Sequence, residues 1–329
     1  MQTKDSALFE VFEHRISLRS MMEELSKKEL VNLCRRHDIR GYSHWNKQEL
    51  VEHISEYILS EPVIYNFFLC MNDLEIEYMR MALECGGIIE EAEPEAFSYM
   101  IYGGYAGFTS NLEFGVPSEV LERFAAFDSE EFEKKRRRIC LIGNYCHVAN
   151  YLYGVAPPMK VVRIVNRYER EKTDWREVMN VYGTIAKYRC DFCYIDNYFV
   201  DTAFINNYEE LLELQGNIPY YLPQWDEIQE WFQYGFSSDT TYILELYRYM
   251  TEQLWLDGDM ASEICFMLDN TIHIGGSADQ VFESLKELGL RCRTRRQERE
   301  FRGLLASLIN HTRMVIYRGY TPLEAARLQ

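Results

Sequence analysis

The sequence begins two helices in almost the same way, twenty residues apart. Ser26-Lys-Lys-Glu29-Leu30-Val31 and Asn46-Lys-Gln-Glu49-Leu50-Val51 each place a capping side chain three residues before a glutamate. In such a capping box the first side chain accepts a hydrogen bond from a free backbone N–H, and the glutamate reaches back to the capping residue. The repeat therefore predicts two short helices joined by a turn at Arg40-Gly41-Tyr42-Ser43.

Each predicted helix carries one apolar stripe. The stripe of the first helix is Leu30, Leu33, Cys34 and His37, and that of the second is Leu50, Ile54 and Ile58. A helix of this kind buries its apolar face and leaves the opposite face to solvent. The hairpin therefore has one side to bury.

The opposite side and the turn are basic. Residues 26–47 hold six lysines and arginines against two acids, whereas the whole chain has a formal net charge of −17. That net charge repels polynucleotides at long range, so any contact with phosphate must be local. The candidates for such a contact are Lys28, Arg35, Arg36, Arg40, His44, Trp45 and Lys47.

Residues 26–58 resemble a SAP-type helix-loop-helix module and the N-terminal module of the termination factor Rho. The resemblance rests on Glu29-Leu30, Leu33, Ile39, Gly41 and Lys47-Gln48-Glu49-Leu50-Val51. It implies contact with DNA or RNA through backbone amides and basic side chains of the connector. The alternative interpretation is a small helical hairpin that only packs on its neighbour.

A second basic cluster lies further along the chain, where three glutamates between positions 130 and 133 run into five cations at 134–138. Acidic side chains at the start of a helix and basic side chains at its end interact favourably with the helix dipole. A solvent-exposed connecting helix therefore explains this run of charges without a ligand. Such a cluster can also bind a phosphate backbone. The further candidates for phosphate contact are Lys134, Lys135, Arg136 and Arg137.

Two hairpin signals follow helical segments. We expect Tyr105–Thr109 to pair with Leu112–Val116 across Ser110-Asn111. Two alternating segments flank Asp196-Asn197, which is a two-residue hairpin turn signal. We therefore expect a mainly α fold with small β-hairpins. Its parts are a SAP-like module at 1–60, a winged-helix-like module at 61–127, a basic connecting helix at 128–141, a second helix-plus-hairpin module at 142–205, and a C-terminal helical domain at 206–329.

A second resemblance covers residues 279–325. Asn310-His311-Thr312-Arg313-Met314 and Arg318-Gly319-Tyr320-Thr321-Pro322-Leu323-Glu324 are similar to the segment that precedes the SEC-C zinc-binding motif of bacterial proteins. The resemblance points to a bacterial or phage origin. The cysteine-rich zinc motif itself is absent from this sequence, so its zinc site cannot be carried over.

The cysteines predict no disulfide framework. There are nine, an odd number, and most lie in apolar periodic segments, which favours reduced thiols and a cytoplasmic protein. No apolar run approaches the roughly 20 residues of a membrane span. Cys190 and Cys193 have the spacing of metal ligands, but no second pair follows at finger-like spacing, so we expect neither metal nor cofactor.

The sequence thus favours a non-enzymatic protein that associates with DNA or RNA through local basic patches. One alternative is an interaction adaptor whose acidic surface, rich in the chain's 24 tyrosines, binds another protein. Another is an enzyme whose site assembles from distant residues. A pocket that gathers histidine and carboxylates would favour the enzyme.

Overall fold

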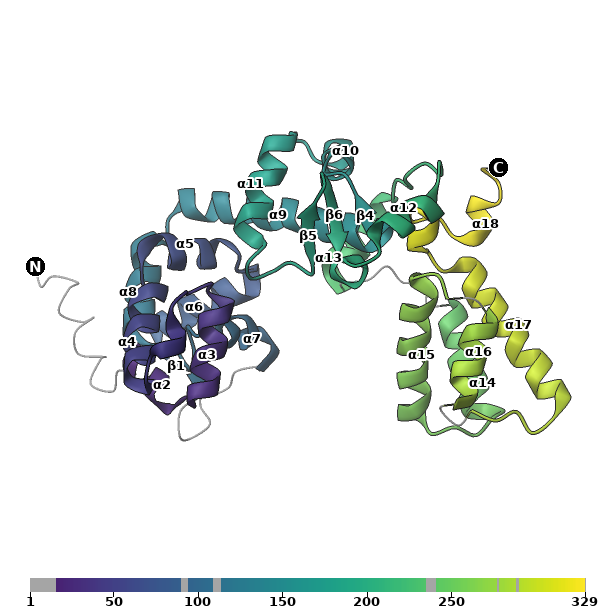
Figure 1. Ribbon diagram of the computed structural model, residues 1–329, viewed down its shortest axis with the longest axis horizontal. Helices are drawn as coiled ribbons and strands as arrows, with labels where there is room; N and C mark the ends of the chain where they lie inside the picture. Colours follow the sequence, from purple (N-terminus) through teal and green to yellow (C-terminus); the bar gives the residue numbers. More distant parts are fainter. Residues whose placement is uncertain are drawn as a thin grey trace, which may run out of the picture. The chain divides into compact units, whose positions relative to one another are not determined.

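The computed structural model describes residues 16–89, 94–108, 114–234, 241–276, 278–287 and 290–328. Helices dominate, and two small antiparallel sheets of three strands each accompany them (Figure 1), so the predicted fold class is confirmed. Contacts divide the chain into two compact units. Unit 1 comprises Met1–Gly143 and Asn180–Cys190, and unit 2 comprises Asn144–Met179 and Asp191–Gln329.

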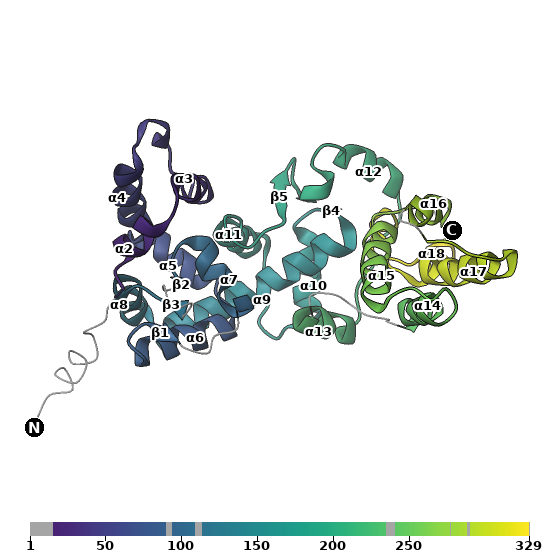
Figure 2. The same ribbon diagram turned by 90° about the horizontal axis from the view of Figure 1, so that it is seen from below.

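Unit 1 begins with the predicted hairpin. Helices α3 (Lys27–Arg36) and α4 (Lys47–Ile58) flank a short 3-10 helix, η1 (Tyr42–His44), as Figure 2 shows. Both capping boxes are formed as predicted. The preceding helix α2 (Leu18–Glu24) was not predicted; the Ser17 hydroxyl caps it by accepting a hydrogen bond from the Ser20 N–H.

The rest of unit 1 builds the first sheet. Strand β3 is central and pairs antiparallel with β1 and β2, with Phe108 opposite Phe114. The predicted turn Ser110-Asn111 lies outside the described residues. The elements are α5 (Glu61–Leu69), α6 (Asp73–Glu84), β1 (Ile88–Ile89), α7 (Pro94–Gly103), β2 (Gly107–Phe108), β3 (Phe114–Gly115) and α8 (Ser118–Phe127).

Helix α9 (Glu130–Tyr153) corrects one predicted boundary. The sequence suggested a connecting helix at 128–141 and a separate apolar helix from 142, yet the two form one helix of 24 residues. Gly143 lies inside this helix and does not end it. A single glycine within a helical segment is tolerated. The chain therefore passes from unit 1 to unit 2 within a continuous helix.

The second sheet lies in unit 2. Its strand order is β4-β6-β5, and all pairs are antiparallel. Asp196 and Asn197 have φ of +46° and +69°, the two-residue turn that the sequence predicted. Strand β4 was not predicted. The elements of this part of the chain are β4 (Val155–Ala156), α10 (Met159–Tyr168), α11 (Trp175–Ile185), β5 (Phe192–Ile195) and β6 (Tyr198–Asp201), and α11 belongs to unit 1 from Asn180 onward.

The remainder of unit 2 is helical, as predicted. One of its core clusters includes Leu246, Met250, Leu268, Phe301 and Leu305. None of the helices in the described ranges is long and apolar enough to cross a membrane. The elements are η2 (Thr202–Phe204), α12 (Tyr208–Gln215), α13 (Trp225–Tyr234), α14 (Thr241–Glu252), α15 (Gly258–His273), α16 (Ala278–Glu287), α17 (Arg295–His311), η3 (Val315–Tyr317) and α18 (Pro322–Ala325).

Candidate nucleic-acid interface

The apolar stripes of the hairpin are buried as predicted. Leu30 and Cys34 on α3, and Leu50 and Ile54 on α4, are fully removed from solvent. Gly41 adopts the left-handed conformation, with φ of +82°, which a residue with a side chain rarely adopts. The packed stripes and the glycine turn together fix which side of the hairpin faces outward.

His37 anchors the end of α3 in the core. Its Nε2 lies 2.8 Å from the Gly103 carbonyl oxygen, which can only accept, so Nε2 carries the proton. Nδ1 then accepts a hydrogen bond of 3.1 Å from the Tyr188 hydroxyl. Burial lowers the pKa of His37 to about 4, so the ring is neutral at pH 7. This histidine supports the interface and takes no part in it.

The candidate residues of the hairpin lie mainly on its outer side. Lys28, Arg35, Arg40, His44 and Lys47 are exposed, and Arg36 and Trp45 are half-buried. The Trp45 ring stacks on the His53 ring at 4.2 Å between centroids, so one face of the indole is already covered.

Polar neighbours hold two of these arginines in place. Arg35 donates to the Tyr42 hydroxyl and to Asn32 Oδ1, both at 3.4 Å. Arg36 donates to the Tyr102 carbonyl oxygen at 2.9 Å, and its guanidinium carbon lies 4.2 Å from the centroid of the Tyr102 ring. Tyr102 lies 66 residues after Arg36, so no local sequence pattern links the two.

Lys47 ties the start of α4 to the end of α2. Its Nζ donates a hydrogen bond of 2.6 Å to the Glu23 backbone carbonyl. The pKa of Glu29 is lowered, first by hydrogen bonds from Ser26 and to a smaller degree by the charge of Lys47. Across the described residues, however, no carboxylate forms an ion pair with Lys28, Arg35, Arg36, Arg40 or Lys47.

The second candidate cluster, on α9, is divided between surface and interior. Lys134 and Lys135 are exposed, and Lys135 Nζ lies 4.9 Å from the centroid of the Tyr65 ring. Arg137 is also exposed, but its Nε donates to Glu133 at 2.6 Å. Only the two lysines therefore remain without an acidic partner among the described residues.

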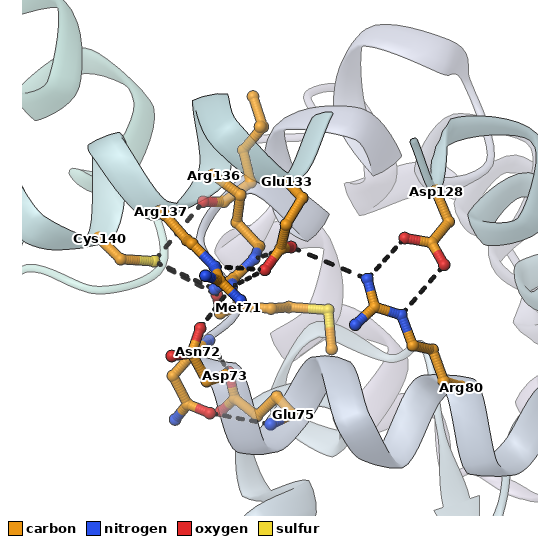
Figure 3. Close-up of polar contacts among 11 residues, drawn as sticks. Met71, Asn72, Asp73, Glu75, Arg80, Asp128, Glu133, Arg136, Arg137 and Cys140 are labelled. Carbon is orange, nitrogen blue, oxygen red and sulfur yellow. Dashed lines mark hydrogen bonds and ion pairs between the residues drawn. The ribbon is translucent and has the colours of Figure 1, made fainter. Parts of the chain in front are cut away.

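Arg136 corrects the expectation of a solvated cluster. Only 1% of its side chain is exposed, and Figure 3 shows it between α9 and the start of α6. One terminal nitrogen donates to the Met71 carbonyl at 2.6 Å, and the other to Glu133 at 2.9 Å and to Asp73. A guanidinium whose donors are used inside the protein cannot reach phosphate, so Arg136 leaves the candidate interface.

The charges around Arg136 stabilise one another. Hydrogen bonds from Arg136, and then from Arg137, lower the pKa of Glu133 to about 2 against the opposing effect of burial. Burial alone would lower the pKa of Arg136, but the bonds to Glu133 and Asp73 raise it overall. The neighbouring Arg80 donates two hydrogen bonds to Asp128, at 2.8 and 3.1 Å. This ion-pair network joins α6, α8 and α9 of unit 1.

No metal centre emerges at the two weak candidate ligands. Cys193 Sγ lies 3.6 Å from the Val200 carbonyl oxygen, within its own hairpin. Within the described ranges, no group of three or more histidine, cysteine, aspartate or glutamate side chains is arranged to hold a metal ion. Cys190 and Cys193 are thus not part of a recognisable site.

One cavity in unit 2 does gather a histidine and a carboxylate. It has a volume of about 270 Å³, and Tyr151, Asp201 and His273 line it. Both ring nitrogens of His273 face carbonyl oxygens, of Arg313 at 2.7 Å and Tyr151 at 2.9 Å. Asp201 accepts hydrogen bonds from the Ala203 N–H and from Asn150. His273 and Asp201 are thus both hydrogen-bonded to other groups of unit 2.

The chain matches no family model, no curated protein and no solved structure. The resemblances at residues 26–58 and 279–325 therefore remain predictions from the sequence.

Proposed function

We propose that this chain is a non-enzymatic, nucleic-acid-associated protein whose N-terminal hairpin contacts the phosphate backbone. One observation carries the proposal. The side chains of four hairpin cations are exposed and have no carboxylate partner among the described residues: Lys28, Arg35, Arg40 and Lys47. In a chain with a net charge of −17, acids are abundant, so such cations are positioned for an external anion.

The rest of the fold is compatible with this role. The order α9, β4, α10, α11, β5, β6, with the sheet order β4-β6-β5, supports the assignment of a winged helix to this part of the chain. Winged helices bind nucleic acid or other proteins, so this assignment alone does not choose between the two. The exposed cations of the hairpin are the observation that favours nucleic acid in this proposal.

The experiment uses the full chain and fluorescein-labelled single- and double-stranded oligonucleotides at about 100 mM salt, where weak surface contacts are already screened. The test variant is Lys28→Gln/Arg35→Gln/Arg40→Gln. The matched control is Arg293→Gln/Arg295→Gln/Arg299→Gln, which removes the same charge from exposed positions of unit 2.

Fluorescence anisotropy should show an affinity at least about tenfold lower for the hairpin variant, because three phosphate contacts are lost. The control should bind as the wild type does. Equal affinity of the hairpin variant and the wild type would refute the hairpin contact. No binding by any form, together with a stable protein complex in pull-downs, would favour the interaction adaptor instead.

A further inference from the structure

A third group of cations lies in unit 2, where Lys160 and Arg318 both contact the Tyr220 ring. Lys160 and Arg163 are one helical turn apart on α10, and Arg318 directly follows η3. Lys160 Nζ lies 4.3 Å from the centroid of the Tyr220 ring, and Arg318 Cζ lies 4.4 Å from it. Two segments far apart in the sequence thus bring their positive charges to one tyrosine.

Arg318 is held in a fixed position. Its Nε donates to Gln215 Oε1 at 3.2 Å, and one terminal nitrogen donates to the Ile218 carbonyl at 2.6 Å. Gln215 is itself fully buried and donates to the Tyr153 and Val315 carbonyls, both at 2.8 Å. The second terminal nitrogen of Arg318 has no hydrogen bond within the described part of the chain. A guanidinium fixed in this way loses little entropy when it binds an anion.

The three charges are not balanced by acids. Along the described ranges, no carboxylate forms an ion pair with Lys160, Arg163 or Arg318. The pKa of Lys160 is lowered by its burial and then by the charges of Arg163 and Arg318. A bound anion would offset this repulsion.

We propose that Lys160, Arg163 and Arg318 form a binding site for a phosphate group. Two guanidinium groups and an ammonium supply charge-assisted hydrogen bonds to several phosphate oxygens at once, and the planar donors of arginine suit this geometry. The phosphate belongs either to a polynucleotide backbone or to a free phosphate or pyrophosphate ion. The site involves no residue of the N-terminal hairpin, so it stands independently of the function proposed above.

The test is Lys160→Gln/Arg163→Gln in the full chain, with Arg170→Gln/Arg176→Gln as the control. The control removes the same charge from exposed positions of unit 2. Isothermal titration calorimetry with inorganic phosphate and with pyrophosphate measures free anions. An oligonucleotide titration in the Lys28→Gln/Arg35→Gln/Arg40→Gln background measures the polynucleotide without the hairpin contact.

We expect at least one of these ligands to bind the parent protein and to bind the site variant at least about tenfold more weakly, with the control unchanged. If the site variant binds the free anions more weakly, the site is assigned to small phosphates. If only its affinity for the oligonucleotide falls, the site is assigned to the polynucleotide backbone. Lys160→Arg, which keeps the charge, should retain binding, and the circular dichroism spectrum of the double variant should match that of the parent protein. The proposal would be overturned if the parent protein bound none of these ligands, or if the parent protein and the site variant bound them with equal affinity.

Discussion

The two basic clusters of unit 1 look alike in the sequence and differ in the structure. The hairpin cluster points outward, and its cations contact hydroxyl groups, amides, carbonyl oxygens and a tyrosine ring. In the α9 cluster, Arg136 is buried between Glu133, Asp73 and the Met71 carbonyl, and Arg137 pairs with Glu133. Similar residue types are therefore exposed in one place and used in the cohesion of the fold in the other.

Helical position explains the difference. Arg136 lies four residues after Phe132 and three before Ile139, and both of these are buried, so all three share the inward face of α9. Arg35 lies on α3 away from the buried Leu30 and Leu33. The basic residues of a helix therefore have to be compared in position with its buried apolar residues before they are assigned to ligand binding.

The largest expected effect comes from Arg136→Met. Removing the guanidinium takes from the largely buried Glu133 carboxylate its buried cationic partner, leaving it only the exposed Arg137 and the more distant Arg80, and takes from the Met71 carbonyl a hydrogen bond of 2.6 Å. Breaking one side of a buried ion pair costs about 4 kcal/mol of unfolding free energy. Urea unfolding followed by circular dichroism measures it.

Arg137→Gln is the matched control, because Arg137 also pairs with Glu133 but is 66% exposed. Its loss should cost less than about 1 kcal/mol. Equal stabilities of Arg136→Met and the wild type would show that the comparison between the two clusters is wrong.

A second effect, of about 3 kcal/mol, should appear with pH. The pKa of His37 falls from 6.5 to about 4 in the folded protein because of burial, so the unfolded state binds the proton more readily. The contribution of His37 to stability is full above pH 6.5 and is lost as the pH falls toward 4. Unfolding free energies of the wild type and His37→Gln between pH 4 and 7 measure it. Parallel profiles for the two proteins would rule out a buried neutral histidine.

A smaller effect should follow from Asn46→Ala, which removes the cap of α4. The Asn46 side chain accepts a hydrogen bond of 3.0 Å from the Glu49 N–H, and loss of such a cap costs about 1 kcal/mol. Because α4 begins at the end of the connector, we also expect weaker oligonucleotide binding. Asn46→Asp keeps the cap and should restore stability; failure to do so would mean that the cap is not what matters there.

Local signals made much of the fold predictable. The two capping boxes, the buried stripes of α3 and α4, and the Asp196-Asn197 turn depend on residues within a few positions of one another. Arg296 and Arg302 likewise pair with glutamates four residues away on α17, Glu300 and Glu298.

The features that the sequence missed depend on distant partners. Arg136 meets Met71 and Asp73 on another helix, and Arg318 meets Lys160 only through Tyr220. Strand β4 has two residues, too few for an alternating pattern, and is defined by its pairing with β6. Contacts between residues this far apart in the sequence leave no periodic pattern within a single segment.

The most direct test of the account is the salt dependence of oligonucleotide binding. The logarithm of the binding constant falls against the logarithm of salt concentration with a slope of about 0.9 per phosphate neutralised on duplex DNA. For Lys28→Gln/Arg35→Gln/Arg40→Gln the slope should therefore be smaller than that of the wild type by about 2 to 3. An unchanged slope would show that the hairpin cations do not contact phosphate.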